Sequence, residues 1–242
     1  MLAQGLSQAG IGLPILLYFY TVLAMNPLLQ ALLARPDVWQ ASHPRPSDPE
    51  PTGATVLPSG HASLDAVLYR GGWPRAALTE LLGSTWGIGE IQLLAPLLAR
   101  CSSGTRRLFF LDPPHLPYAP ALSTHGIRLE AALLVQSGSG NDALWCAEQI
   151  LRSGAASCLL AWLPEARLAN YATLRRLQLA AQAGDVTAFM FRPPRAAREP
   201  SPAALRITLR AAGAHLELAI LKQRGGRSGQ QLVLARDAAL LQ

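Results

Sequence analysis

The stretch ALTELLGSTWGIGEI, residues 77–91, decides the fold class of this 242-residue chain. Its first half is mostly apolar, as in a buried strand, and a glycine-rich loop leads from there into a helix-like run. A loop of this kind presents backbone N–H groups and a helix N-terminus to a phosphate group. The stretch therefore predicts an α/β protein with a loop in the position of a phosphate-binding loop.

The residues of the loop depart from those that bind a nucleoside triphosphate. A Walker A loop follows the pattern G-x-x-x-x-G-K-[ST]. Counted from Gly83, Ile88 stands at the position of the second glycine, Gly89 at that of the lysine and Glu90 at that of the serine or threonine. No other frame recovers the lysine, because Lys222 is the single lysine of the chain. The degenerate loop comprises Gly83, Ser84, Thr85, Trp86, Gly87, Ile88, Gly89 and Glu90. A carboxylate at this position repels a triphosphate. Two interpretations of the loop stay open: a plain glycine-rich turn, or a residual nucleotide site.

Strand-like and helix-like runs alternate after the loop. The expected strands are Ala77–Leu82, Arg106–Leu111, Ala132–Val135, Ser157–Trp162 and Val186–Phe191. Two helices are expected between them: Asp142–Ser153, closed by Gly154, and Ala166–Ala183, closed by Gly184 as a C′ residue. The strands are continuously apolar, which predicts cover on both faces. The alternation predicts a mostly parallel sheet with crossover helices.

The last part of the chain changes character. Three strands are expected in succession at Ala204–Arg210, His215–Leu221 and Gln231–Leu234. Glycine-containing turns join them, at Ala211–Ala214 and at Gln223–Gly229. This arrangement predicts an antiparallel β-meander added to the edge of the parallel sheet.

The sequence before the core has two expected parts. Residues 1–24 carry no charge, and we interpret them as an upstream leader or a mis-assigned start, with Met25 as the true first residue. Leu17–Val22 is encodable by DNA resembling a CTGT…ACAG operator of the LexA type. The alternative is an apolar anchor, but Ile11–Met25 is shorter than the ~20 residues of a spanning helix and contains Pro14.

Residues 25–57 are expected to hold an N-terminal helix and a proline-rich linker, ahead of a core at 58–242. The helix is predicted over Asn26–Gln40 from its leucine spacing, either as core packing or as a docking helix.

Charge and cysteine content limit the classes of function. The formal charge of +6 favours partners with negative surfaces. Three cysteines without a C-x-x-C pair support neither a disulfide framework nor a zinc cluster, and the histidines lack metal-ligand spacing. We expect reduced thiols in a cytoplasmic protein with no metal site.

Several motifs in order resemble the core of RecA, over about residues 58–235. They are PSGHASLD at Pro58–Asp65, GGWPRAALTE at Gly71–Glu80, RLFFLDPPH at Arg107–His115 and ILRSGAASCLLAW at Ile150–Trp162. The combination with the GIGE of the loop is more closely similar to ImuA, a RecA-related family that is also grouped with the cell-division inhibitor SulA. The resemblance implies a RecA-like fold.

In the comparison with RecA, Pro114 stands at the position of the catalytic glutamate and Trp162 at that of the Walker B aspartate. With the missing lysine, three requirements of Mg-ATP hydrolysis are absent, so we expect a pseudo-ATPase without a cofactor. The ImuA resemblance implies a non-catalytic adaptor of SOS-induced translesion DNA synthesis. Its implied partners are an ImuB-like Y-family-like protein, RecA and an error-prone C-family polymerase assembly. The alternatives are a SulA-like inhibitor that binds the tubulin-like septum protein, and a surviving nucleotide-binding module.

The same resemblance assigns contact residues. Lys222 and Arg224 correspond to a basic pair that reaches a neighbour's ATP in RecA filaments, although KQRGGRSG is also typical of a solvated hairpin tip. Arg192, Arg195 and Arg198 correspond to a DNA-contacting loop. No aromatic residues interleave with these arginines, so weak non-specific contact with DNA phosphates is the expectation.

Overall fold

The computed structural model describes residues 55–138, 140–163 and 170–236. The expectations for the leader, the N-terminal helix and the proline-rich linker up to residue 54 lie outside the described residues. The described part opens with a two-stranded antiparallel sheet, in which β1 (Val56–Leu57) pairs with β2 (Trp73–Pro74). Between these strands lie α3 (Ala62–Asp65) and η1 (Tyr69–Gly71).

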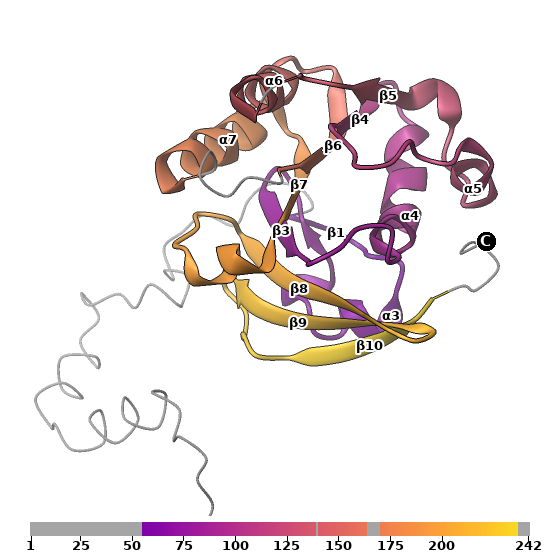
Figure 1. Ribbon diagram of the computed structural model, residues 1–242, viewed down its shortest axis with the longest axis vertical. Helices are drawn as coiled ribbons and strands as arrows, with labels where there is room; N and C mark the ends of the chain where they lie inside the picture. The colour runs from indigo at the N-terminus through magenta and orange to yellow at the C-terminus, as the bar shows by residue number, and fades with distance from the viewer. Residues whose placement is uncertain (1–54, 139, 164–169, 237–242) are drawn as a thin grey trace, which may run out of the picture. The chain divides into compact units, whose positions relative to one another are not determined.

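The main sheet has eight strands in the order β10-β9-β8-β3-β7-β6-β4-β5, seen running through the centre of Figure 1. Its strands are β3 (Leu78–Leu82), β4 (Arg107–Leu111), β5 (Ala132–Val135), β6 (Ala156–Trp162), β7 (Thr187–Arg192), β8 (Leu205–Ala212), β9 (His215–Gln223) and β10 (Gln231–Ala235). The parallel strands are, in order across the sheet, β8, β3, β7, β6, β4 and β5. Strands β8, β9 and β10 form an antiparallel meander. The predicted fold class is confirmed.

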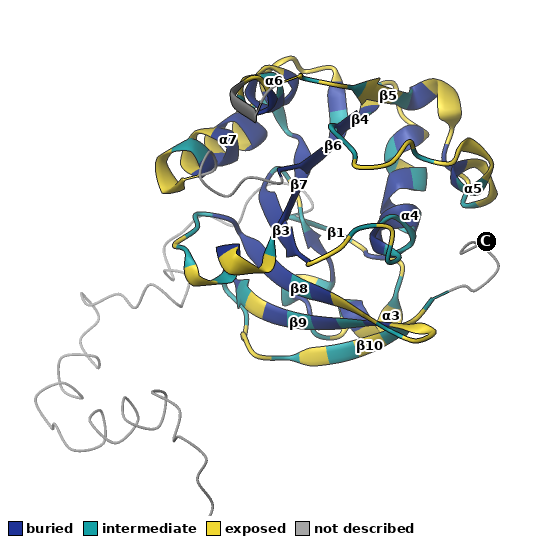
Figure 2. Ribbon diagram, in the orientation of Figure 1, coloured by how far each residue is buried: buried dark blue, intermediate teal, exposed yellow. Residues whose placement is uncertain are grey.

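Helices cover both faces of the parallel part. The α/β layers include α4 (Glu90–Ser102), α5 (Ala119–Thr124), α6 (Gly140–Arg152) and α7 (Tyr171–Gly184). Side chains of α4 pack with Leu81 on one face, and side chains of α6 and α7 pack with Leu78 on the other. Strands β3, β6 and β7 are accordingly buried almost throughout, as Figure 2 shows. Two short 3-10 helices, η2 (Leu129–Ala131) and η3 (Pro194–Arg198), complete the described elements.

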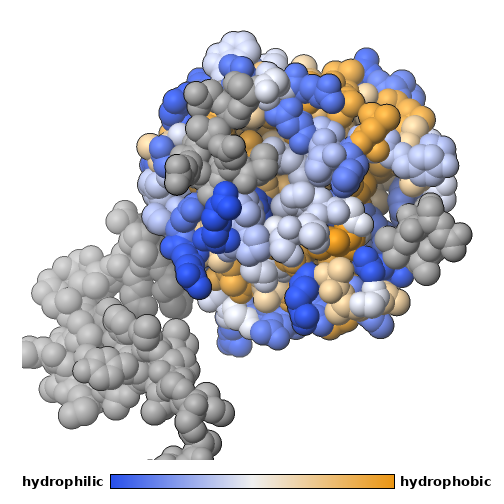
Figure 3. All heavy atoms as spheres, in the orientation of Figure 1, coloured by the Kyte–Doolittle hydropathy of each residue, from blue (hydrophilic) through white to orange (hydrophobic). Residues whose placement is uncertain are grey.

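Three local expectations are corrected. β5 was expected to be covered on both faces, but it is an edge strand, and Leu133 and Leu134 are exposed. Figure 3 shows apolar side chains in the region where β5 and α5 lie in Figure 1. Helix α7 begins at Tyr171 behind the N-cap Asn170, whereas the first residues of its expected range are not described. The left-handed residue after α7 is Asp185, not Gly184.

In the described ranges, no helix is long and apolar enough to cross a membrane. The same ranges contain no group of three or more His, Cys, Asp or Glu residues placed to hold a metal ion.

Candidate functional site

The glycine-rich loop connects β3 to α4 at the carboxyl edge of the parallel strands. Gly83 donates its backbone N–H to Arg192 O at 3.1 Å, which extends the β3–β7 pairing by one residue. Gly87 and Gly89 adopt left-handed φ values of 78° and 107°, a conformation that residues with a Cβ rarely adopt. Gly89 is the N-cap of α4. The chain thus keeps the strand, loop and helix geometry of a phosphate-binding loop.

The carboxylate of Glu90 is hydrogen-bonded to the backbone of this loop. It accepts the backbone N–H of Gly87 at 2.8 Å through one oxygen and that of Ile88 at 2.9 Å through the other. Glu90 is 3% exposed and begins α4, where the helix dipole also favours a negative charge. A phosphate group at this position would have to displace a carboxylate that already occupies two backbone donors.

Aromatic rings fill the neighbouring space. Trp162, at the end of β6, stacks on Phe191 of β7 with ring centroids 4.2 Å apart and an interplanar angle of 10°. Trp86 of the loop meets the same Phe191 ring edge-on at 5.3 Å. The position that the RecA resemblance assigns to a Walker B aspartate is therefore part of an aromatic cluster, which offers no oxygen ligand for Mg²⁺.

A pocket of about 230 Å³ lies between the loop, the segment after β4 and α5. Its lining is mostly apolar and consists of Gly87, Gly89, Glu90, Ile91, Gln92, Pro113, Pro114, His115, Leu116, Pro117, Tyr118, Ala121, Leu122, His125 and Trp162. Glu90 is the one carboxylate in this lining, and its oxygens are engaged by the loop. The residues of the site do not fit Mg-ATP.

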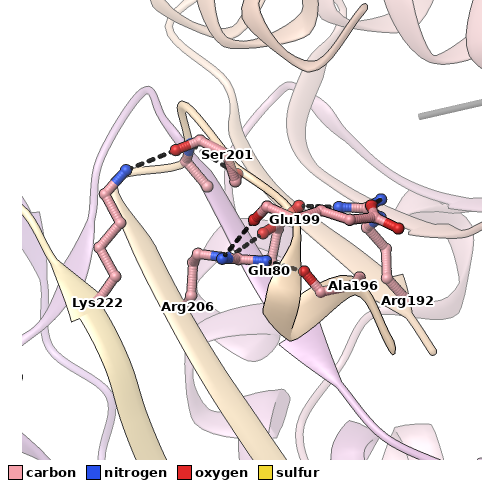
Figure 4. Close-up of polar contacts among 8 residues, drawn as sticks. Glu80, Arg192, Ala196, Glu199, Ser201, Arg206 and Lys222 are labelled. Carbon is pink, nitrogen blue, oxygen red and sulfur yellow. Dashed lines mark hydrogen bonds and ion pairs between the residues drawn. The ribbon is translucent and has the colours of Figure 1, made fainter. Parts of the chain in front are cut away.

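A buried ion-pair network ties β3 to β7, β8 and η3 (Figure 4). Glu80 of β3 is fully buried and receives Arg192 Nη1 at 2.5 Å on one oxygen and Arg206 Nε on the other. Arg206 also donates to the carbonyl oxygen of Ala196 at 2.5 Å, and Arg192 pairs with Glu199 at 2.7 Å. The network fixes η3 and the residue after it against the sheet.

This network contradicts the expected DNA contact of Arg192. The side chain of Arg192 is inaccessible to solvent and is committed to Glu80 and Glu199. The sequence pattern RPPRAAR did not show that its first arginine is the last residue of a buried strand. Arg195 and Arg198, both on η3, are exposed.

Lys222 lies in β9, which extends to Gln223, whereas Arg224 is the first residue of the turn after the strand. Lys222 is half-buried and donates from Nζ to Ser201 O at 2.7 Å. Burial, with smaller contributions from Arg206 and Arg224, lowers the pKa of Lys222 below its usual value. Arg224 is exposed.

The structure separates this pair from the loop. Gln223 is paired with Leu205, and Leu205 with Thr79 near the start of β3, whereas the loop follows Leu82 at the other end of that strand. The degenerate loop, Pro114 and Trp162 come together around one pocket, while the basic residues gather near η3 and the segment before β8.

One residue at the loop was not predicted. Arg236, just after β10, donates from Nη1 to Ile88 O at 3.0 Å and also bonds to Gly213 O. Nothing in its local sequence indicated this contact, because it depends on the meander folding back toward the loop.

Fold and site define an α/β protein with a mostly parallel sheet, in which two backbone amides of the loop between β3 and α4 bind the carboxylate of Glu90. A family model described as "Cell division inhibitor SulA" matches residues 83–188, from the loop into β7. RecA of Oleidesulfovibrio alaskensis is 33% identical over 112 residues, which are 45% of this chain and 31% of that protein. RecA 1 of Myxococcus xanthus is 32% identical over 108 residues, 43% of this chain and 30% of that protein.

A crystal structure of SulA from Pseudomonas aeruginosa is also similar, with 28% identity, a TM-score of 0.38 and coverage of 48% of this chain and 97% of that one. The family-model match and the similarity to the RecA proteins confirm the resemblance to RecA-related, SulA-like proteins. The chain spans about three tenths of the length of the RecA relatives it matches.

Proposed function

We propose that this protein is a non-catalytic adaptor of SOS-induced translesion DNA synthesis that binds RecA and an ImuB-like partner, within an assembly with an error-prone C-family polymerase. The observation that carries the proposal is the pair of hydrogen bonds from the loop amides to Glu90. A chain that keeps a RecA-like sheet and loop but fills the anion position with its own side chain retains the surfaces of an ATPase without the means of turnover.

The exposed basic residues supply the candidate contact surface. We define the η3 basic patch as Arg195, Arg198 and Arg224, with Lys222 beside it. Lys222 is already hydrogen-bonded to Ser201 O, so Arg224 is the member of the basic pair that we assign to the partner's phosphate groups or to an acidic face of RecA. Arg195 and Arg198 are assigned to weak contact with DNA phosphates, which should fall steeply with salt.

Binding to RecA filaments on single-stranded DNA tests the patch. We expect Arg224→Glu to weaken binding at least tenfold, because it reverses charge at the contact. Arg128→Glu is the matched control, since Arg128 is also exposed and lies next to η2, away from the η3 basic patch. Equal binding by both variants and the parent would refute the assignment of Arg224.

Titration with Mg-ATP tests the absence of nucleotide chemistry separately. We expect no saturable binding in the micromolar range, because Glu90 blocks the loop. Tight Mg-dependent binding would contradict the pseudo-ATPase proposal and favour a surviving nucleotide-binding module instead.

A second function is a SulA-like inhibitor of cell division that binds the tubulin-like septum protein. It is favoured by the family-model match over residues 83–188, which includes the loop and most of the parallel strands. Polymerisation of the septum protein with increasing amounts of the purified chain separates the two proposals. Stoichiometric inhibition without binding to RecA filaments would support the inhibitor, and the reverse would support the adaptor.

A further inference from the structure

The pocket beside the loop is large enough for one bulky apolar side chain. Its volume is about 230 Å³, whereas a cavity of about 150 Å³ already holds a benzene ring. Leu122 of α5 and Trp162 of β6 line the pocket and are almost completely buried. Pro113, Pro114 and Pro117, from the segment between β4 and α5, line it as well. An apolar group that enters the pocket is therefore surrounded by apolar contacts.

Large apolar side chains are exposed at the rim of this pocket and beyond it. At the rim, Leu116 is 79% exposed and Tyr118 is 69% exposed. Leu129 of η2 and Leu134 of β5 are exposed as well. Leu134 is paired with Phe110, which packs in the same core cluster as α5, so Leu134 lies on the side of the sheet that α5 covers. Exposed apolar side chains that gather on one side of a protein are typical of a surface that contacts another protein.

Three polar side chains at the pocket are available to donate hydrogen bonds. His115, Tyr118 and His125 line the pocket, and none of them is hydrogen-bonded through its side chain to another described residue. Each imidazole carries at least one N–H, and the phenol carries an O–H. Glu90 is the one carboxylate of the lining, and its oxygens already accept two loop amides. Residues 113–127 contain no carboxylate, so a carboxylate brought by a partner would meet donors and no negative charge from this segment.

We propose that the pocket docks a segment of a partner protein in which a large apolar side chain stands directly beside a carboxylate. The apolar side chain enters the pocket, and the carboxylate accepts hydrogen bonds from His115, His125 or Tyr118. Leu116 then covers the anchor at the rim and excludes water, as residues around the anchor of an interface do. The exposed surface beyond the rim favours a protein segment over a free small molecule. The proposal goes beyond the proposed function, because it assigns a second contact surface that does not involve the η3 basic patch.

Selection of random dodecapeptides displayed on phage, with the purified full chain as bait, tests the proposal. We expect the enriched peptides to carry Phe, Tyr, Trp or Leu directly beside Asp or Glu. Replacement of that acidic residue by its amide should weaken binding about tenfold, because the carboxylate loses its charge-assisted hydrogen bonds. Enriched peptides without an acidic residue, equal binding of the amide peptide, or no enrichment at all would overturn the proposal.

A variant that fills the pocket shows whether an enriched peptide enters it. Ala121 of α5 lines the pocket, so Ala121→Trp should weaken binding of the peptide about tenfold. Ala119→Trp is the matched control, since Ala119 lies in the same helix, is exposed and is not part of the lining. Equal binding of the peptide to the two variants would contradict the proposal.

A second variant guards against a folding defect. Leu116→Ser changes a side chain that is 79% exposed, and we expect it to weaken binding of the peptide about fivefold. Leu179→Ser is its control, because Leu179 is 49% exposed on α7, which packs on the other face of the sheet. Binding that is unchanged in Leu116→Ser, or reduced equally in both variants, would also contradict the proposal.

Discussion

Glu80 and Arg192, which are 112 residues apart in sequence, form an ion pair at 2.5 Å with both side chains excluded from solvent. Arg206 completes the charge compensation on the second oxygen of Glu80. A buried charge that loses its partner is costly, since the remaining charge stays desolvated. The network is therefore a point at which a single substitution reaches four elements, β3, β7, β8 and η3.

Glu80→Gln should lower the free energy of unfolding by about 3–5 kcal/mol, because two buried guanidinium groups lose their shared carboxylate. Urea denaturation at neutral pH measures the change. Glu199→Gln is the control, with a side chain that is 38% exposed and an expected loss of about 1 kcal/mol or less. Similar losses for the two variants would show that the buried position of Glu80 has no special weight.

Glu90→Ala should destabilise the protein by about 1–3 kcal/mol, because the amides of Gly87 and Ile88 lose their acceptor. The emptied loop should also gain weak affinity for inorganic phosphate. Thermal unfolding with and without phosphate checks both effects, and we expect phosphate to raise the Tm of the variant more than that of the parent. An equal response in the two proteins would argue against an anion position filled by Glu90.

Gly184→Ala should be among the most damaging glycine substitutions in the chain. A Cβ at this position would lie 1.9 Å from the carbonyl oxygen of Leu151 in α6, so α6 and α7 would have to separate. We expect a loss of about 3 kcal/mol, at the upper end for overpacking. Gly104→Ala is the matched control, because its Cβ would meet no atom closer than 3.9 Å. A tolerated Gly184→Ala would contradict this close helix contact.

Asp185→Asn should cost about 1 kcal/mol at neutral pH, a small value because the ion pairs of Asp185 with Arg75 and Arg106 are partly exposed. Hydrogen bonding to Arg75, with smaller contributions from Arg106, lowers the pKa of Asp185 below its usual value. The stabilisation is thus complete above that value and disappears as the pH falls through the folded-state pKa. The difference between parent and variant, measured by urea denaturation from about pH 6 to about pH 3, should shrink toward acid. A difference independent of pH would assign the effect to the left-handed backbone of Asp185.

The sequence predicted the sheet well where strands are continuously apolar. The predicted strand Ala132–Val135 has the bounds that the structure shows. The predicted bounds of β3, β6 and β7 differ from the observed ones by at most one residue at each end. The failure at β5 was one of burial, because an edge strand and a central strand carry the same local pattern of Leu and Val. Strand β9 ran on to Gln223 because the pairing of Leu205 with Gln223 extends it beyond its apolar residues.

The loop was placed correctly, but its occupant was not foreseen in detail. The sequence showed that Glu90 stands where a cation and a hydroxyl belong; it did not show that the carboxylate turns back onto the amides of its own loop. The predicted DNA contact of Arg192 was wrong, because a polar residue after an apolar run can be either the last residue of a strand or the first residue of a loop. Its burial depends on Glu80, more than a hundred residues away.

The Glu90 closure has a consequence for control of the protein in the cell. An ATPase changes state with the ratio of ATP to ADP, whereas under the proposed function a loop held by its own side chain would not respond to that ratio. Under the proposed function, the partner-binding form is permanent from the moment the chain folds. Its effect is then set by copy number, through the rates of synthesis and proteolysis.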